Sequence, residues 1–247
     1  MDINFRVLKE PLGFIRTIQI VIAIFAFATT SGFGSKSSFR VKCMTSEKET
    51  DINYEYGYPF RLRYSNFIVP KCDGTYDTTT EKIPYDFSSS AEFFVTTGVL
   101  TFMYSLGITL FYIFAHQKYI DDQVVPITDL GITGILTIFW LAGSSAWAQG
   151  VSDMKYYTSP VTLAKNLEVC STLATCETTF EGNYATLNVS LIFGFANCLL
   201  WASSLWFVYK ETVFHYQRQE LLKQLPPQYP QSYPQTQSPG MDMQFQY

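Results

Sequence analysis

The stretch AEFFVTTGVLTFMYSLGITLFYIFA, residues 91–115, holds a single charged residue, Glu92, and that residue lies at its start. A helix needs roughly 20 largely apolar residues to cross the hydrocarbon core of a bilayer. Three other segments meet the same requirement, and they occupy residues 12–33, 127–148 and 187–209. The sequence therefore predicts an all-α membrane protein built as a bundle of four transmembrane helices.

The composition supports this class and excludes others. Only 15% of the 247 residues are charged, whereas soluble domains carry about 25%. The net charge of −4 and the lack of a basic stripe argue against nucleic acid as a partner. With two histidines, and no metal-ligand spacing, phosphate loop or nucleophile motif, we expect no catalytic residue, no metal site, no cofactor and no enzyme activity.

The four apolar segments divide the remainder of the chain. We expect extramembrane pieces at 1–11 (leader), 34–90 (first loop), 116–126 (short connection), 149–186 (second loop) and 210–247 (tail). The tail is rich in Pro, Gln, Tyr and Ser and has too few aliphatic residues to pack, which predicts disorder. One alternative concerns the first segment, because Ala26-Phe27-Ala28 is also compatible with a signal-peptide cleavage site that would leave three spans.

The cysteines predict the orientation of the chain. Cys43 and Cys72 lie in the first loop, and Cys170 and Cys176 lie in the second. Paired cysteines on one face indicate disulfides in an oxidising compartment, so both loops are expected to be lumenal and the leader, connection and tail cytosolic. Four cysteines allow three connectivities, and proximity favours pairing within each loop. Cys198, inside the fourth segment, is left unpaired.

The first loop shows a strand pattern. Apolar and polar side chains alternate from residue 52 to residue 64, which is typical of a half-buried strand, and Pro59 marks a break or an edge. Residues 39–43 and 67–72 are expected to flank it. These features predict a small β-rich lumenal domain closed by a Cys43–Cys72 bridge.

Polar residues near the spans are expected to cap helices. Ser89 and Glu92 have the spacing of a capping box, and Asp129 fits the first turn of the third span, where the helix dipole favours negative charge. The alternative is that an intramembrane carboxylate marks an ion or proton path. Because no central charge pair and no polar pore face are evident, we expect no transporter or channel, although a pore between subunits stays an alternative.

Small side chains line the third and fourth spans. In lipid, helices associate through close contact of small residues, and two such strips are present: Ala142, Gly143, Ala146 and Gly150, and then Gly194, Cys198 and Ala202. We expect them to pack within the bundle, and the alternative is a surface for partner helices. Trp147 is expected near the membrane interface.

The tail contains one short recognition motif. Pro226, Pro227 and Tyr229 form a PPxY sequence, the kind of extended ligand that WW domains bind. Such a motif also arises by chance in a tail of this composition.

Several motifs together resemble the synaptophysin family, whose members are four-span vesicle proteins with a MARVEL-type domain. The matching stretches run in order from about residue 9 to residue 212, and they include KEPLGFIRTIQ, YPFRL, SSSAEFFVT, FWLAGSSAWA, LNVSLIFGFANCLLW and WFVYKET. The chain departs from many relatives at Thr30-Ser31, where those have Cys-Gly, and it lacks a glycosylation sequon in the first loop.

The resemblance implies a retained first span, cytosolic termini and one disulfide in each lumenal loop. It also implies residence in synaptic or other small transport vesicles, self-association into homo-oligomers, binding of cholesterol, and pairing with a synaptobrevin-like vesicle SNARE. Association with the vacuolar-type proton pump is a further implied property. We therefore expect a non-enzymatic vesicle protein that organises membrane partners in exocytosis, and the alternative is an oligomeric channel.

Overall fold

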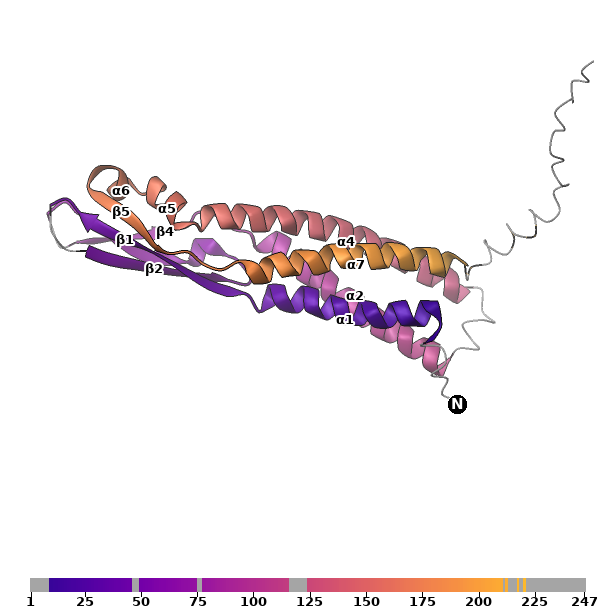
Figure 1. Ribbon diagram of the computed structural model, residues 1–247. Helices are drawn as coiled ribbons and strands as arrows, with labels where there is room; N and C mark the ends of the chain where they lie inside the picture. Colours follow the sequence, from indigo (N-terminus) through magenta and orange to yellow (C-terminus); the bar gives the residue numbers. More distant parts are fainter. Residues whose placement is uncertain are drawn as a thin grey trace, which may run out of the picture.

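Four long helices lie side by side, and a group of strands and short helices gathers at one end of them (Figure 1). This computed structural model describes residues 9–45, 49–74, 77–115 and 124–210, together with residues 212, 217 and 220. The PPxY residues Pro226, Pro227 and Tyr229, both histidines and most of the leader, connection and tail fall outside the described residues.

The four predicted membrane spans are confirmed as helices. They are α1 (Pro11–Ser31), α2 (Ser88–Phe114), α4 (Val124–Tyr157) and α7 (Ala185–Lys210), and each is long and apolar enough to cross a bilayer. Most ends lie within three residues of the expected ones. The exception is α4, which continues nine residues past residue 148 because Val151 and Met154 remain buried and Pro160 is the first proline after it.

The helices form a closed ring with antiparallel neighbours. α1 packs against α2 and α7, and α4 packs against the same two helices. α1 and α4 therefore face each other diagonally across the ring. Pro11 at the start of α1 and Lys210 at the end of α7 both lie at the end of the bundle opposite the strands (Figure 1).

The strands form two antiparallel sheets. The larger has the order β2–β1–β5, from β1 (Gly34–Cys43), β2 (Glu49–Gly57) and β5 (Ala174–Phe180). The smaller pairs β3 (Asn66–Pro70) with β4 (Thr78–Lys82). Residue Phe39 lies opposite Ile52 in β2, and Val41 lies opposite Cys176 in β5.

The period-two pattern predicted a strand correctly but placed its end too late. Three alternate side chains of β2 point into the hydrophobic core, as expected: Ile52, Tyr54 and Tyr56. The strand ends at Gly57, before Pro59, which cannot donate a ladder hydrogen bond. The remaining residues turn back through a single 3-10 turn, η2 (Leu62–Tyr64), and residues 66–70 join the smaller sheet.

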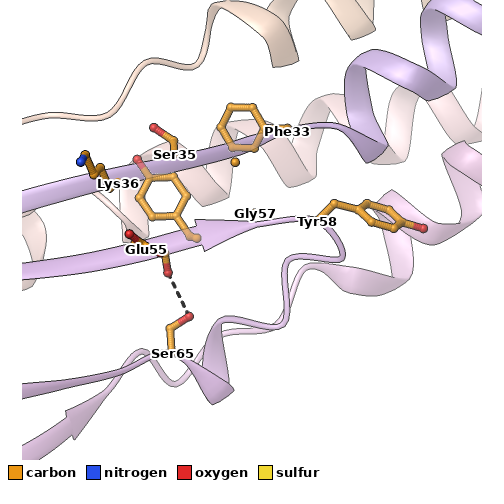
Figure 2. Close-up of a pocket in the computed structure, with 9 residues that line it drawn as sticks. Phe33, Ser35, Lys36, Glu55, Gly57, Tyr58 and Ser65 are labelled. Carbon is orange, nitrogen blue, oxygen red and sulfur yellow. Dashed lines mark hydrogen bonds between the residues drawn. The ribbon is translucent and has the colours of Figure 1, made fainter.

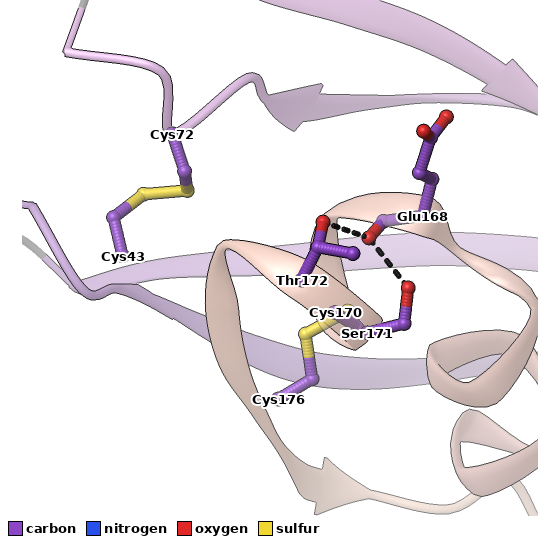
Figure 3. Close-up of a disulfide and its surroundings, with 7 residues drawn as sticks. All are labelled: Cys43, Cys72, Glu168, Cys170, Ser171, Thr172 and Cys176. Carbon is purple, nitrogen blue, oxygen red and sulfur yellow. Dashed lines mark hydrogen bonds between the residues drawn. A yellow bond between two sulfur atoms is a disulfide. The ribbon is translucent and has the colours of Figure 1, made fainter.

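The two predicted disulfides are present at the strand end of the molecule (Figure 3). Cys43, the last residue of β1, is bonded to Cys72, which follows β3, so this bridge ties the two sheets together. Cys170 in α6 (Glu168–Thr172) is bonded to Cys176 in β5. The α6 turn, which contains Cys170, is stabilised by the hydroxyls of Ser171 and Thr172, which donate to the Glu168 carbonyl oxygen at 2.8 and 2.9 Å.

Aromatic rings seal the junction between strands and helices. Phe60 is fully buried, and its ring centroid lies 5.1 Å from that of Trp147 in α4 and 5.8 Å from that of Phe33. The hydroxyl of Tyr54 in β2 donates to the carbonyl oxygen of Thr158 at 2.7 Å, and burial raises the pKa of this phenol. The sheet is therefore packed on the bundle by both rings and hydrogen bonds.

Removal of the two disulfides is expected to have unequal effects. The Cys43–Cys72 bridge closes 29 residues and the Cys170–Cys176 bridge closes 6. In the chain-entropy model, loss of the first lowers the free energy of unfolding by about 3.6 kcal/mol and loss of the second by about 2.2 kcal/mol. Thermal unfolding of the Cys43→Ser/Cys72→Ser and Cys170→Ser/Cys176→Ser proteins in mild detergent measures both, and a larger loss from the second pair would contradict the expectation.

Candidate functional site

A charged pair lies inside the helix bundle, at the end away from the strands. Arg16 in α1 and Asp129 in α4 are 0% and 2% exposed, and Arg16 Nη2 lies 2.6 Å from Asp129 Oδ1. Because α1 and α4 are diagonal partners, this ion pair crosses the centre of the ring. Ionisable residues at such positions in a membrane protein are rare and are functional candidates by default.

The carboxylate is fully surrounded by donors. Tyr104 and Tyr112, both in α2, donate their hydroxyls to Asp129 Oδ1 and Oδ2, each at 2.6 Å. Thr133 lies one helical turn after Asp129 and donates to Oδ1 at 3.2 Å. Four donors therefore contact the carboxylate, three on Oδ1 (Arg16, Tyr104 and Thr133) and one on Oδ2 (Tyr112).

The guanidinium is held on its other sides by α1, α4 and α7. Arg16 Nη1 donates to Gln19 Oε1 at 3.2 Å, and Nη2 also donates to Thr133 Oγ1 at 2.8 Å. Its Cζ lies 5.3 Å from the centre of the Trp201 ring and 5.6 Å from that of Tyr104, within the range of cation–π attraction. All four helices therefore contribute to one group, which we call the polar clasp: Arg16, Gln19, Tyr104, Tyr112, Asp129, Thr133 and Trp201.

The polar clasp overturns the expected role of Asp129. Since α4 begins at Val124, Asp129 lies beyond the first turn, where the dipole of the helix N-terminus no longer acts strongly. The expectation that no charge pair crosses the spans is also wrong. A signal was present in the sequence: Arg16 and Asp129 each lie five residues past the start of their helices, Pro11 and Val124, and these two helices begin at the same end of the bundle.

The buried ion pair between Arg16 and Asp129 needs hydrogen bonds from its surroundings. Moving two ions out of water costs several kcal/mol each, and the pair is tolerated only with good geometry and further hydrogen bonds. The polar clasp supplies hydrogen bonds to both Nη atoms of Arg16, although the buried Nε has no partner among the described residues. Asp129 thus serves as a fixed acceptor that ties α2 and α4 to the cation of α1.

The comparison with protein families agrees with this architecture. The chain matches the family described as MARVEL, membrane-associating domain, over residues 7–207. It belongs to the MARVEL family. The matched residues include both disulfides and every member of the polar clasp, and they reach to within three residues of the end of α7. The MARVEL domain therefore contains nearly all of the described structure.

The interior of this MARVEL domain is polar over much of its length, so the expectation that it lacks a polar inner face is wrong. α2 buries four hydroxyl residues spaced about one turn apart, and α7 buries three polar residues spaced about two turns apart: Thr97, Thr101, Ser105 and Thr109 in α2, and Ser190, Asn197 and Ser204 in α7. Several of these hydroxyls donate to carbonyls of the preceding turn, as Thr101 does to Thr97 at 2.9 Å. The outer surface is apolar instead, with Met103, Ile138 and Leu199 more than 60% exposed.

Large indole rings fill the same interior. Trp140, Trp147 and Trp201 are each 0% exposed. The indole N–H of Trp147 donates to Ser190 Oγ at 3.1 Å. The side chain of Trp147 therefore points inward between α4 and α7 and does not face outward from the bundle.

The small residues of the third and fourth spans divide into two groups. Gly143, Gly150 and Gly194 face inward. A Cβ at Gly150 would lie 2.6 Å from Ser90 Oγ, and one at Gly194 would lie 2.6 Å from the Phe94 ring, so the helices pack closely there.

The alanines of the predicted strips do not share this packing. Ala142, Ala146 and Ala202 are exposed on the outside of the bundle, and the thiol-bearing Cys198 is half-buried and unpaired. Each strip is therefore divided between two faces of its helix, because the glycines turn inward and the alanines turn outward.

The predicted capping box at the start of α2 is absent. The helix begins at Ser88 with Phe87 at the N-cap position, and no side-chain capping hydrogen bond forms there. Asp86 instead accepts a hydrogen bond from the Ser88 backbone N–H at 3.0 Å, and hydrogen bonds from Ser88 hold the pKa of Asp86 below its usual range. Glu92 pairs with Arg61 at 2.8 Å on the exposed surface, because Arg61 reaches it from the turn after β2.

Breaking the polar clasp at one partner is expected to destabilise the bundle strongly. Asp129→Asn leaves Arg16 charged and buried, and the free energy of unfolding should fall by about 3–5 kcal/mol. The double variant Arg16→Met/Asp129→Asn removes the unpaired charge and should lose less. Detergent-unfolding curves measure the difference, with Glu92→Gln, which breaks the exposed pair, as the control expected to change stability by about 0.5 kcal/mol at most.

The two groups of small residues are expected to respond differently to added volume. Gly194→Ala places a methyl group against Phe94 and Ser144, and should lower the free energy of unfolding by about 1–3 kcal/mol. Ala142→Leu extends into the lipid and should leave it within about 0.5 kcal/mol. Thermal unfolding of both variants measures this, and an equal loss would contradict the assignment of inner and outer faces.

Proposed function

We propose that this MARVEL protein is a member of the synaptophysin type. In this proposal it lies in the membrane of synaptic or other small transport vesicles, where it organises partner membrane proteins and cholesterol laterally and so acts in vesicle trafficking and exocytosis. The partners are a synaptobrevin-like vesicle SNARE, further copies of the chain itself and, as a further candidate, the vacuolar-type proton pump. The order and specificity of the motifs in the sequence support this assignment to the synaptophysin type.

One structural observation carries the proposal. The exposed surface of α4 and α7 presents Ala142, Ala146 and Ala202 to the lipid, while the inward glycines already account for packing within the bundle. In lipid the hydrophobic effect does not drive helices together, so partner helices associate where small residues allow close approach. Outward alanines on a bundle that is already closed are available to a partner helix.

The disulfides support the proposed orientation. Cys43–Cys72 and Cys170–Cys176 lie at the strand end, and disulfides persist in oxidising compartments such as the lumen of the secretory pathway. We therefore propose that the sheets are lumenal and that both termini are cytosolic, where the tail is placed to recruit soluble factors.

The experiment compares partner recovery between inner and outer variants. The tagged protein is purified from vesicle membranes in mild detergent, and the vesicle SNARE is quantified by mass spectrometry. Ala146→Leu and Ala202→Leu should reduce its recovery about tenfold, which corresponds to a loss of about 1.4 kcal/mol. Ala28→Leu, an exposed alanine on α1, is the matched control and should leave recovery unchanged.

Two outcomes would contradict the proposal. SNARE recovery that is insensitive to both variants would remove the α4 and α7 surface as the contact. Equal loss in Ala28→Leu would show a general effect of added bulk in the membrane.

A channel is the second candidate, and the polar interior favours it. Hydroxyl side chains line the inside of the bundle from Thr97 to Thr109. The buried tryptophans and the aromatic seal at Phe60 fill the same space, which makes lateral organisation the better-supported function. Discrete conductance in reconstituted bilayers, abolished by Thr101→Leu, would reverse that order.

A further inference from the structure

A groove of about 630 Å³ opens where the helix bundle meets the larger sheet (Figure 2). Its floor is a pair of glycines, Gly34 in β1 and Gly57 in β2, which lie directly opposite each other in the sheet. A Cβ at Gly34 would meet nothing within 4 Å, so the floor is open. At Gly57 a Cβ would lie 2.8 Å from the Phe33 carbonyl oxygen, so the close backbone approach there requires glycine.

Opposite charges stand side by side at one end of the groove. Lys36 and Glu55 are paired across β1 and β2, two residues beyond the glycines and on the same face of the sheet. Both side chains are exposed. Ser65 donates its hydroxyl to the Glu55 carbonyl oxygen at 3.2 Å and closes the edge of β2 beside them.

These two charges differ from the other charged pairs on that face. Further along the same strands, Arg40 contacts Asp51 at 2.7 Å and Lys42 contacts Glu49 at 3.3 Å. Within the described residues, neither Lys36 nor Glu55 forms an ion pair within 4 Å. An ammonium and a carboxylate therefore remain available over the groove.

The other end of the groove faces the membrane. α1 ends at Ser31, three residues before Gly34, so the groove lies at the level where the apolar helix gives way to the sheet. Phe33 and Tyr58 stand at this end, nearer to the helices than Lys36 and Glu55 are (Figure 2). Tyrosine is favoured at the headgroup level of a bilayer, and the largely buried Phe33 packs against Phe60 and Tyr184 beside it.

We propose that this groove binds the headgroup of a zwitterionic phospholipid from the leaflet on the strand side. Lys36 contacts the phosphate and Glu55 contacts the ammonium group, while the glycerol end runs along Phe33 and Tyr58 toward the bundle. A purely anionic headgroup would meet the charge of Glu55, and a purely cationic ligand would meet that of Lys36. The headgroup with both charges is the one that matches the pair.

The test measures lipid retention by native mass spectrometry of the intact, detergent-purified protein. Phosphatidylcholine and phosphatidylglycerol with identical acyl chains are added separately. Phosphatidylcholine should be retained in preference to phosphatidylglycerol. Lys36→Gln and Glu55→Gln should each reduce its retention about fivefold, the effect of losing one exposed charged contact.

Matched controls separate the groove from the remainder of the surface. Lys42→Gln removes a charge from the same face of β1 outside the groove and should leave retention unchanged. Gly34→Leu fills the floor and should abolish retention, whereas Gly131→Leu adds the same side chain at an open position on α4 and should not. Monodisperse elution with both disulfides intact verifies that each variant is folded. If Gly34→Leu does not fold, the retention measured for Lys36→Gln tests the proposal.

Three results would overturn the proposal. The first is equal retention of phosphatidylglycerol, and the second is an effect of Lys42→Gln as large as that of Lys36→Gln. The third is displacement of the lipid by an equal concentration of free glycerophosphocholine, which would identify a soluble zwitterion as the ligand.

Discussion

The ion pair between Arg16 and Asp129 is the constraint on which the bundle depends. In hydrocarbon an unpaired charge is costly, so each partner must find the other at the same depth in the membrane. The two residues come from diagonal helices, and their 2.6 Å contact sets the position of α1 relative to α4. Tyr104 and Tyr112 add α2, and Trp201 adds α7, so one site fixes the register of all four helices.

This constraint also explains the polar interior. A membrane bundle gains no hydrophobic free energy by burying leucine, because the lipid outside is equally apolar. Hydroxyls, an asparagine and indole N–H groups can therefore occupy the centre, where they are shielded from lipid. Thr101, Trp147 and Ser190 reach a carbonyl or a neighbouring side chain, whereas the indole N–H groups of Trp140 and Trp201 have no partner among the described residues. The apolar residues lie on the outside, and among them are the exposed alanines of α4 and α7 to which the proposed partner contacts are assigned.

The strand end follows different rules because it lies in water. There the core is aromatic, with Phe33, Tyr56 and Phe60 packed between the sheet and the helices. The Cys43–Cys72 bridge holds the two small sheets together, each of which has few strands to stabilise it. The proposed phospholipid groove lies at the boundary between these two environments.

The sequence by itself determined the four helices and the presence of a strand in the first loop, and it favoured both disulfides, because these depend on local hydropathy, on side-chain alternation and on cysteines close in the chain. Only the tertiary structure decided which side of each helix turns inward. Asp129 was expected to cap its own helix. The fold instead brings it into contact with Arg16, which is 113 positions away in the sequence. Likewise Ala146 and Gly150 belong to the same i, i+4 strip in the sequence, yet Ala146 faces outward and Gly150 faces Ser90. The packing of the four helices selects which side of each helix turns inward, and the hydropathy of a uniformly apolar span does not.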